Sequence, residues 1–89
     1  MRKAIITVVG NDSVGIIAGV CTFLAEKSIN ILDITQSIVD GYFNMMMVVD
    51  VTPYEDLGEI IDELKATGEK LGVVIKCQRA EIFESMHRI

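Results

Sequence analysis

Two β-type segments in the middle of the chain are separated by only two residues, Asp40-Gly41. Residues 29–39 and 42–51 are both rich in β-branched or aromatic residues, which favour strands. Because Asp-Gly suits the two positive-φ positions of a tight turn, the segments are predicted to form an antiparallel hairpin. Any fold of this chain must accommodate that hairpin.

The segments before the hairpin predict a strand and then a helix. Residues 3–9 form a β-branched run that ends at Gly10, typical of a buried strand. From Ser13 or Val14 to Lys27, apolar residues recur at helical spacing, and Asp12 or Ser13 is the expected N-cap.

After the hairpin, Thr52-Pro53 ends the strand, since proline cannot donate to a ladder. A second helix is then predicted, ending at Gly72 as C-cap, with an acidic face and an interior Gly68 that weakens it by about 1 kcal/mol relative to alanine. Residues 73–79 predict a fourth strand, and the tail from Ala80 predicts a short helix. The apolar stripe of the second helix is Leu57, Ile60, Ile61, Leu64 and Leu71, and that of the tail is Ile82, Phe83, Met86 and Ile89.

The order β-α-β-β-α-β predicts an α+β fold of the ferredoxin-like type, an antiparallel sheet with two helices on one face. The 89 residues are enough for one domain, 1–89, which is marginal as an isolated monomer. The chain is 51% hydrophobic, more than so small a body can hide. We therefore expect oligomerisation.

Composition argues against several classes of partner. There are 13 acidic and 8 basic residues, and six of the acidic ones crowd into residues 55–69, so no nucleic-acid partner is expected. An RNA-recognition module would carry aromatic residues on its central strands, where we place Ile6, Val8, Met45 and Met47. No apolar run reaches membrane-spanning length, and no signal peptide precedes the first strand, so the chain is expected to be cytoplasmic.

No catalytic residue, metal site or cofactor is expected. Cys21 and Cys77 lack a C-x-x-C partner and fall on predicted core positions, which favours inert thiols. His87 has no ligand constellation around it and is expected at a surface or interface. The run Met45-Met46-Met47 alternates sides on a strand, so we expect it to pack on both faces.

The loop between the first strand and the first helix, Asn11 to Gly15, is the candidate binding site. Free N–H groups in the first turn of a helix face such a loop and can hold an anion such as an α-carboxylate. A small-ligand sensor is the function that these residues favour.

The stretch GNDSVGIIAGV, followed by NILDI on the next strand, resembles the ACT domain, a small regulatory module that binds amino acids. With the tail IFESMHRI, the chain is most similar to the small stand-alone bacterial ACT-domain proteins and more distantly to the regulator of the glycine cleavage system. Many ACT domains have proline where this chain has Val14.

The resemblance implies ligand binding without catalysis, at the junction of two domains. Four of the implied site residues also have a structural alternative that needs no ligand. These alternatives are a helix cap at Asp12, close packing at Gly15, a turn at Asn30 and a blunted sheet edge at Asp33. Carried over residue by residue, the loop supplies Asn11, Asp12, Ser13, Val14 and Gly15, the helix supplies Ile16 and Ile17, and a strand of the same or the neighbouring chain supplies Asn30, Ile31, Leu32 and Asp33.

Two classes of function follow. The first is a homodimeric module that binds an amino acid or similar small molecule and signals to a protein partner; the same chain could also dimerise without a ligand. The second is a small enzyme or an enzyme accessory with Asp12 and Asp33 as an acid/base pair, which would have to lie close together. The expected dimer pairs two copies of residues 29–39, an edge segment with Asp33 as its one charge, together with the first helix.

Overall fold

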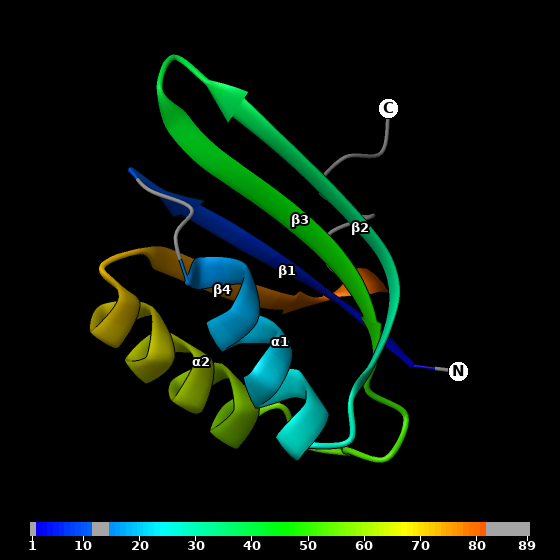
Figure 1. The fold of residues 1–89 in the computed structure, drawn as a ribbon. Coiled ribbons are helices and arrows are strands. Elements are labelled where there is room, and N and C mark those ends of the chain that lie inside the picture. Colours follow the sequence, from blue (N-terminus) through cyan, green and yellow to red (C-terminus); the bar gives the residue numbers. More distant parts are fainter. Residues whose placement is uncertain (1, 12–14, 82–89) are drawn as a thin grey trace.

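The computed structural model describes residues 2–11 and 15–81, which form six elements in the predicted order (Figure 1). The observed ends lie within three residues of the predicted ones. Ala80 and Glu81 are helical, and the rest of the predicted terminal helix, 82–89, lies outside the described residues. The elements are strand β1 (Lys3–Gly10), helix α1 (Ile16–Glu26), strand β2 (Asn30–Val39), strand β3 (Tyr42–Asp50), helix α2 (Gly58–Leu71) and strand β4 (Val74–Arg79).

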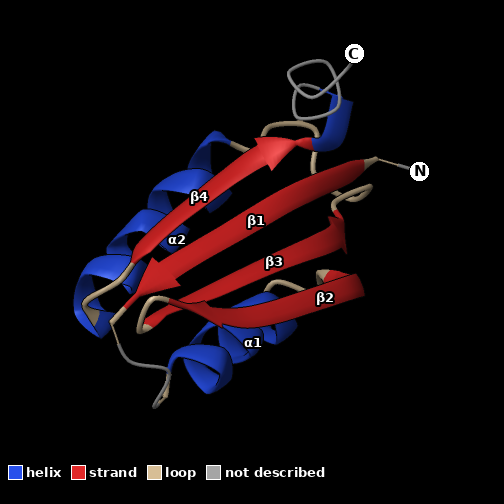
Figure 2. Cartoon of the chain, turned by 90° about the horizontal axis from the view of Figure 1, so that it is seen from above, coloured by secondary structure: helices blue, strands red, loops and turns tan. Residues whose placement is uncertain are grey.

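The four strands form one antiparallel sheet in the order β2-β3-β1-β4. Both helices cover the same face of this sheet, and the opposite face is open in the described part of the chain (Figure 2). This arrangement confirms the ferredoxin-like fold. It leaves β2 and β4 as the two edge strands, each hydrogen-bonded on one side only.

Local turn chemistry fixes two of the connections. Asp40 and Gly41 have φ values of 52° and 81°, so the predicted hairpin turn is confirmed. Gly72 ends α2 in the left-handed conformation with φ of 73°, and its N–H donates to the carbonyl oxygen of Glu69. Glycine is favoured at such a C-cap because it has no Cβ to strain the backbone.

The core lies between the sheet and the helices. Ile6, Val8, Met45 and Met47 are all buried in it. They face the helices and not the open face of the sheet, so the comparison with an RNA-recognition module belongs at the open-face positions of the central strands and not at these four. On the open face of β1 and β3, the one aromatic side chain is Tyr42, at the hairpin end of β3.

Some predicted core positions are more exposed than expected. Ile61 is 37% exposed and does not belong to the buried stripe of α2. Met46 is 40% exposed because it points to the open face, so the methionine run packs on one face only within a single chain. Cys77 is buried as predicted, whereas Cys21 is half-buried.

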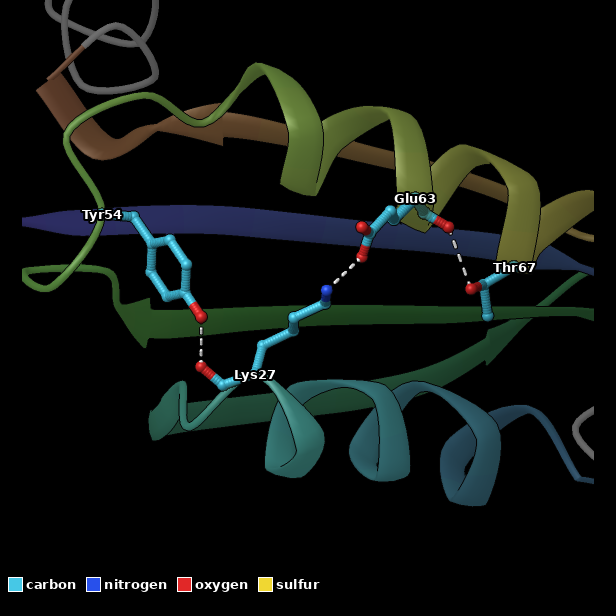
Figure 3. A network of polar contacts seen from close by, with 4 residues as sticks. All are labelled: Lys27, Tyr54, Glu63 and Thr67. Carbon is cyan, nitrogen blue, oxygen red and sulfur yellow. Dashed lines mark hydrogen bonds and ion pairs between the residues drawn. The ribbon is translucent and has the colours of Figure 1, made fainter.

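A polar network joins the C-terminal end of α1 to α2 and to the loop between β3 and α2 (Figure 3). Lys27 Nζ lies 2.7 Å from Glu63 Oε2, and Tyr54 Oη donates to the carbonyl oxygen of Lys27 at 2.5 Å. Thr67 Oγ1 donates to the carbonyl oxygen of Glu63 at 3.0 Å. The hydrogen bond to Glu63 raises the pKa of Lys27 above its ordinary value. The two helices and the loop are thus held in one arrangement.

Candidate functional site

Two glycines shape the junction between β1 and α1. Gly10 ends β1 opposite Phe43, and a Cβ atom at this position would overlap the Val73 side chain. Gly15 has a φ of 76° and is the N-cap of α1, with no side-chain cap hydrogen bond. The predicted cap at Asp12 or Ser13 is therefore wrong, because the left-handed turn at Gly15 starts the helix at Ile16.

The first turn of α1 presents backbone donors toward this junction. The first helical hydrogen bond runs from the N–H of Gly19 to the carbonyl oxygen of Gly15 at 2.9 Å. The N–H groups of Ile16, Ile17 and Ala18 consequently have no acceptor within the helix. No acidic side chain lies in this turn, so the positive end of the helix dipole is not offset there.

An apolar groove lies beside this helix start. Its volume is about 280 Å³, and its walls come from the first turn of α1, the far half of β2 and the start of β3. Ile38 remains 73% exposed in this region although its strand partner Phe43 is buried. The lining residues are Ile17, Gln36, Ser37, Ile38 and Phe43.

Sequence reasoning placed only Ile17 of this groove in the site. The alternation of β2 puts Gln36 and Ile38 on the helix-facing side, which is a signal that the sequence carries. That these residues are uncovered depends on how far α1 reaches across the sheet, and the sequence pattern does not specify that distance.

The predicted site residues divide between the two ends of the sheet. Gly10 is level with Phe43 and Ile38, whereas Lys3 is level with Asp50 and Asn30. At about 3.3 Å per residue, the two ends of β1 are roughly 23 Å apart. The loop end therefore holds Asn11, Gly15, Ile16 and Ile17, and the far end holds Asn30, Ile31, Leu32 and Asp33, while Asp12, Ser13 and Val14 lie outside the described residues.

This separation removes one of the two arrangements left open by the sequence. A single chain does not bring Asn30–Asp33 to its own loop, so only a neighbouring chain could supply that segment to the site. The exposed Asp33 is likewise remote from the loop in which Asp12 lies. The arrangement gives no support to an acid/base pair within one chain.

Residues 30–33, at the far end of the sheet, contain an irregularity in the strand and a local hydrogen bond. The register of β2 against β3 shifts between Ile31 and Asp33, which places a bulge at Leu32. Asp33 Oδ1 accepts a hydrogen bond from the N–H of Ile34 at 2.9 Å. Asp33 thus makes a local hydrogen bond within β2.

The described residues offer few other groups for metal binding or nucleophilic chemistry. Within residues 2–11 and 15–81, no three His, Cys, Asp or Glu side chains gather as a metal site. Burial raises the pKa of the Cys77 thiol to about 11, which disfavours its reactive thiolate.

No helix in the described ranges is long and apolar enough to cross a membrane.

The fold is an α+β domain of the ferredoxin-like type, with the junction of β1 and α1 at one end of its four-stranded sheet. A family model described as "ACT domain" matches residues 2–78, most of the chain. The chain belongs to the ACT domain family, which confirms the resemblance found in its motifs.

Relatives and solved structures agree with this assignment. A UPF0237 protein of Bifidobacterium longum is 58% identical, and one of Methanocaldococcus jannaschii is 43% identical, each over 100% of both chains. Neither has an enzyme name. An ACT domain protein from Streptococcus pneumoniae has 48% identity and a TM-score of 0.86, over 93% of this chain and 94% of that one.

A more distant structure shows the same fold within a longer chain. A protein described as a glycine cleavage system transcriptional repressor has 22% identity and a TM-score of 0.76. The match covers 88% of this chain and 45% of that one, and it is evidence of fold alone.

Proposed function

We propose that this chain is a regulatory module that binds an amino acid or a similar small carboxylate as a homodimer. The observation that carries the proposal is the start of α1, capped by Gly15 and open beside the apolar groove. The ligand carboxylate would accept hydrogen bonds from first-turn N–H groups, and its side chain would lie in the groove. The presence of free cysteines fits a cytoplasmic protein.

The proposed dimer completes the site. Antiparallel pairing of two β2 strands about a two-fold axis at Thr35 would place the partner segment 30–33 beside residues 37–40 of the first chain. That segment would then cover the apolar groove beside α1. The support for this pairing is that β2 is an edge strand and is exposed along almost its whole length.

The dimer would also cover apolar surface that one chain leaves in water. Ile38 is 73% exposed and Ile34 is 38% exposed, both on the helix-facing side of β2. Burial of such side chains contributes about 25 cal/mol per Å² of apolar area removed from water. A two-fold interface uses each such residue twice, once from each copy.

The experiment is a thermal-shift screen of the twenty amino acids, followed by calorimetry on those that stabilise the protein. At roughly a hundred times the dissociation constant, binding stabilises the folded state by about 2.7 kcal/mol. Stabilisation by one or a few amino acids supports the proposal. If none stabilises the protein while light scattering still reports a dimer, the chain is a dimerisation unit without this ligand.

Gly15→Val tests the site itself, with Gly72→Val as its matched control. Both glycines have nearly the same positive φ, 76° and 73°, and a Cβ atom would meet nothing within 4 Å at either position. Backbone strain is therefore similar, but Gly72 lies beside β4, at the opposite edge of the sheet from the groove. We expect ligand binding to be lost in Gly15→Val and retained in Gly72→Val. Equal affinity in the two variants would place the site elsewhere.

A further inference from the structure

We propose a second binding site, for a small organic carboxylate with a short apolar body, at the end of the sheet opposite the loop. A cavity of about 290 Å³ lies there, between the start of β1, the end of β4 and the segment that leads from β3 to α2. We call it the basal pocket. Arg2 and Lys3 line it at one end of β1, whereas the site proposed above lies beyond Gly10 at the other end.

The inner wall of the basal pocket is apolar and fixed in place. Val51, Leu57 and Ala80 line it and are at most 8% exposed. The Tyr54 side chain also lines the pocket, and its hydroxyl is held by the carbonyl oxygen of Lys27 (Figure 3). An apolar group that enters the pocket would meet a preformed surface.

Two guanidinium groups lie at the rim of the basal pocket, in a chain that is acidic as a whole. Arg2, Lys3 and Arg79 line it together with Glu55 and Glu81. Lys3 alternates with the buried Ala4 on β1 and therefore points to the open face, so Arg2 and Arg79 are the two cations that face the pocket. Guanidinium groups favour an anionic ligand, above all a carboxylate, because they can form charge-assisted hydrogen bonds with it.

Arg2 is held at this rim by a small hydrogen-bonded turn. The backbone N–H of Arg2 donates to Thr52 Oγ1 at 3.0 Å, and its guanidinium donates to the carbonyl oxygen of Thr52 at 2.7 Å. Asp50 Oδ1 in turn accepts hydrogen bonds from the N–H and the hydroxyl of Thr52. Only one nitrogen of the guanidinium is used in this way, so further donors remain for a ligand.

Arg79 is the second cation positioned for a carboxylate. Its Nε lies 3.8 Å from Glu81 Oε1, which is an ion pair but longer than a hydrogen bond. The pair is exposed and therefore weak, and a ligand carboxylate could replace Glu81 with bidentate hydrogen bonds at little cost.

The size of the basal pocket limits the ligand. Sites for small molecules run from about 300 to 1,000 Å³, so this cavity is at the lower bound and fits a molecule of roughly metabolite size. One carboxylate at the cationic rim and four or five carbons on the apolar wall match its chemistry. We use 4-methylpentanoate as the probe.

The test is an NMR titration of the ¹⁵N-labelled full chain with 4-methylpentanoate and with its neutral match, 4-methylpentanamide. We expect saturable shifts of the Val51, Tyr54, Leu57 and Ala80 amides with the carboxylate, with a dissociation constant of about 1 mM or tighter. The neutral amide should bind at least about tenfold more weakly, since it cannot form charge-assisted hydrogen bonds. Equal binding of the two probes, or no saturable shift at these amides, would overturn the proposal.

Single substitutions test whether the carboxylate binds in the basal pocket and not elsewhere on the protein. Arg79→Gln should weaken binding of the carboxylate about tenfold, while Lys76→Gln, on the same strand but pointing to the open face, should not change it. Gly15→Val should also leave it unchanged, so the proposal can fail or stand independently of the ligand site at the loop. If Arg79→Gln does not fold, the comparison of the two probes on the wild-type chain still decides.

Discussion

Gly68 shows how a single residue can have a different role in the fold from the one its type suggests. In an isolated helix, glycine costs about 1 kcal/mol relative to alanine, and this was the expectation from sequence. In the structure, a Cβ atom at Gly68 would lie 2.9 Å from the carbonyl oxygen of Val73 and 3.1 Å from Ile75 Cγ1. Glycine here permits the close approach of α2 to β4.

We therefore predict that Gly68→Ala lowers the free energy of unfolding, by about 1–3 kcal/mol, because a backbone carbonyl cannot move aside easily. Gly19→Ala is the matched control in α1. Its Cβ atom would meet only the end of the flexible Leu71 side chain, at 3.0 Å, so its stability should stay the same or increase by up to about 1 kcal/mol. Urea denaturation measures both. A Gly68→Ala variant more stable than wild type would contradict the packing argument.

The charge of Asp50 is predicted to make the stability of the protein depend on pH. Hydrogen bonds from the side chain and backbone of Thr52 hold the pKa of its carboxyl below the ordinary 3.8. A group with a lowered folded-state pKa stabilises the protein above its unfolded pKa, and this stabilisation is lost as pH falls through the folded value. Wild type should therefore have a higher melting temperature than Asp50→Asn at pH 6, with a smaller difference near pH 2. A difference independent of pH would show that the charge of Asp50 does not contribute.

At the scale of elements, the order of strands and helices could be predicted because its signals are local. The Asp40-Gly41 turn, the Gly72 cap and the helical stripe each lie within a few neighbouring residues. The start of α1 was predicted two or three residues too early, because the apolar spacing does not reveal that Gly15 has a positive φ.

The candidate site was less predictable because it depends on strand register and helix reach. The sequence indicated the loop and the segment 30–33 but not that they lie at opposite ends of the sheet. The groove residues Gln36, Ser37, Ile38 and Phe43 come together only because α1 does not cover the far half of β2. Strand register and the reach of a helix across the sheet depend on contacts between distant parts of the chain, which local sequence patterns do not specify.

The contact between Tyr54 and α1 can be tested at the element scale. Tyr54→Phe removes the half-buried hydrogen bond to the carbonyl oxygen of Lys27 and keeps the ring, so we expect a loss of about 1 kcal/mol of stability. Tyr42→Phe changes a half-exposed tyrosine on the open face and should stay within about 0.5 kcal/mol of wild type. Equal losses in chemical denaturation would mean that the hydroxyl of Tyr54 does not hold the loop.

At the scale of the whole molecule, the sheet has two free edges, and they differ in the charge that they carry. Edge strands expose unpaired backbone groups, and proteins blunt them with charge when pairing is to be avoided. β4 carries Lys76 and Arg79, whereas β2 carries only Asp33, whose side chain bonds to the backbone of its own strand. This contrast favours β2 as the edge that pairs.

The double variant Ile34→Lys with Gln36→Lys should therefore give monomers or insoluble protein, because like charges would face each other across the two-fold axis. Val74→Lys with Gln78→Lys places the same charges on β4 and should leave the dimer intact. Light scattering coupled to size exclusion measures both. An unchanged dimer in the β2 variant would move the interface elsewhere, and a monomeric wild type would reject it.

Each proposed ligand site combines the loop of one chain with residues 30–33 of its partner, and complementation between two variants tests this sharing most directly. One variant carries Gly15→Val, the other Asn30→Ala with Asp33→Ala, and neither should bind the amino acid found in the screen. After unfolding and refolding together, mixed dimers would contain one site with both halves intact. Calorimetry should then show binding in the mixture and in neither parent. A mixture that binds no ligand, or a parent variant that still does, would contradict the shared site.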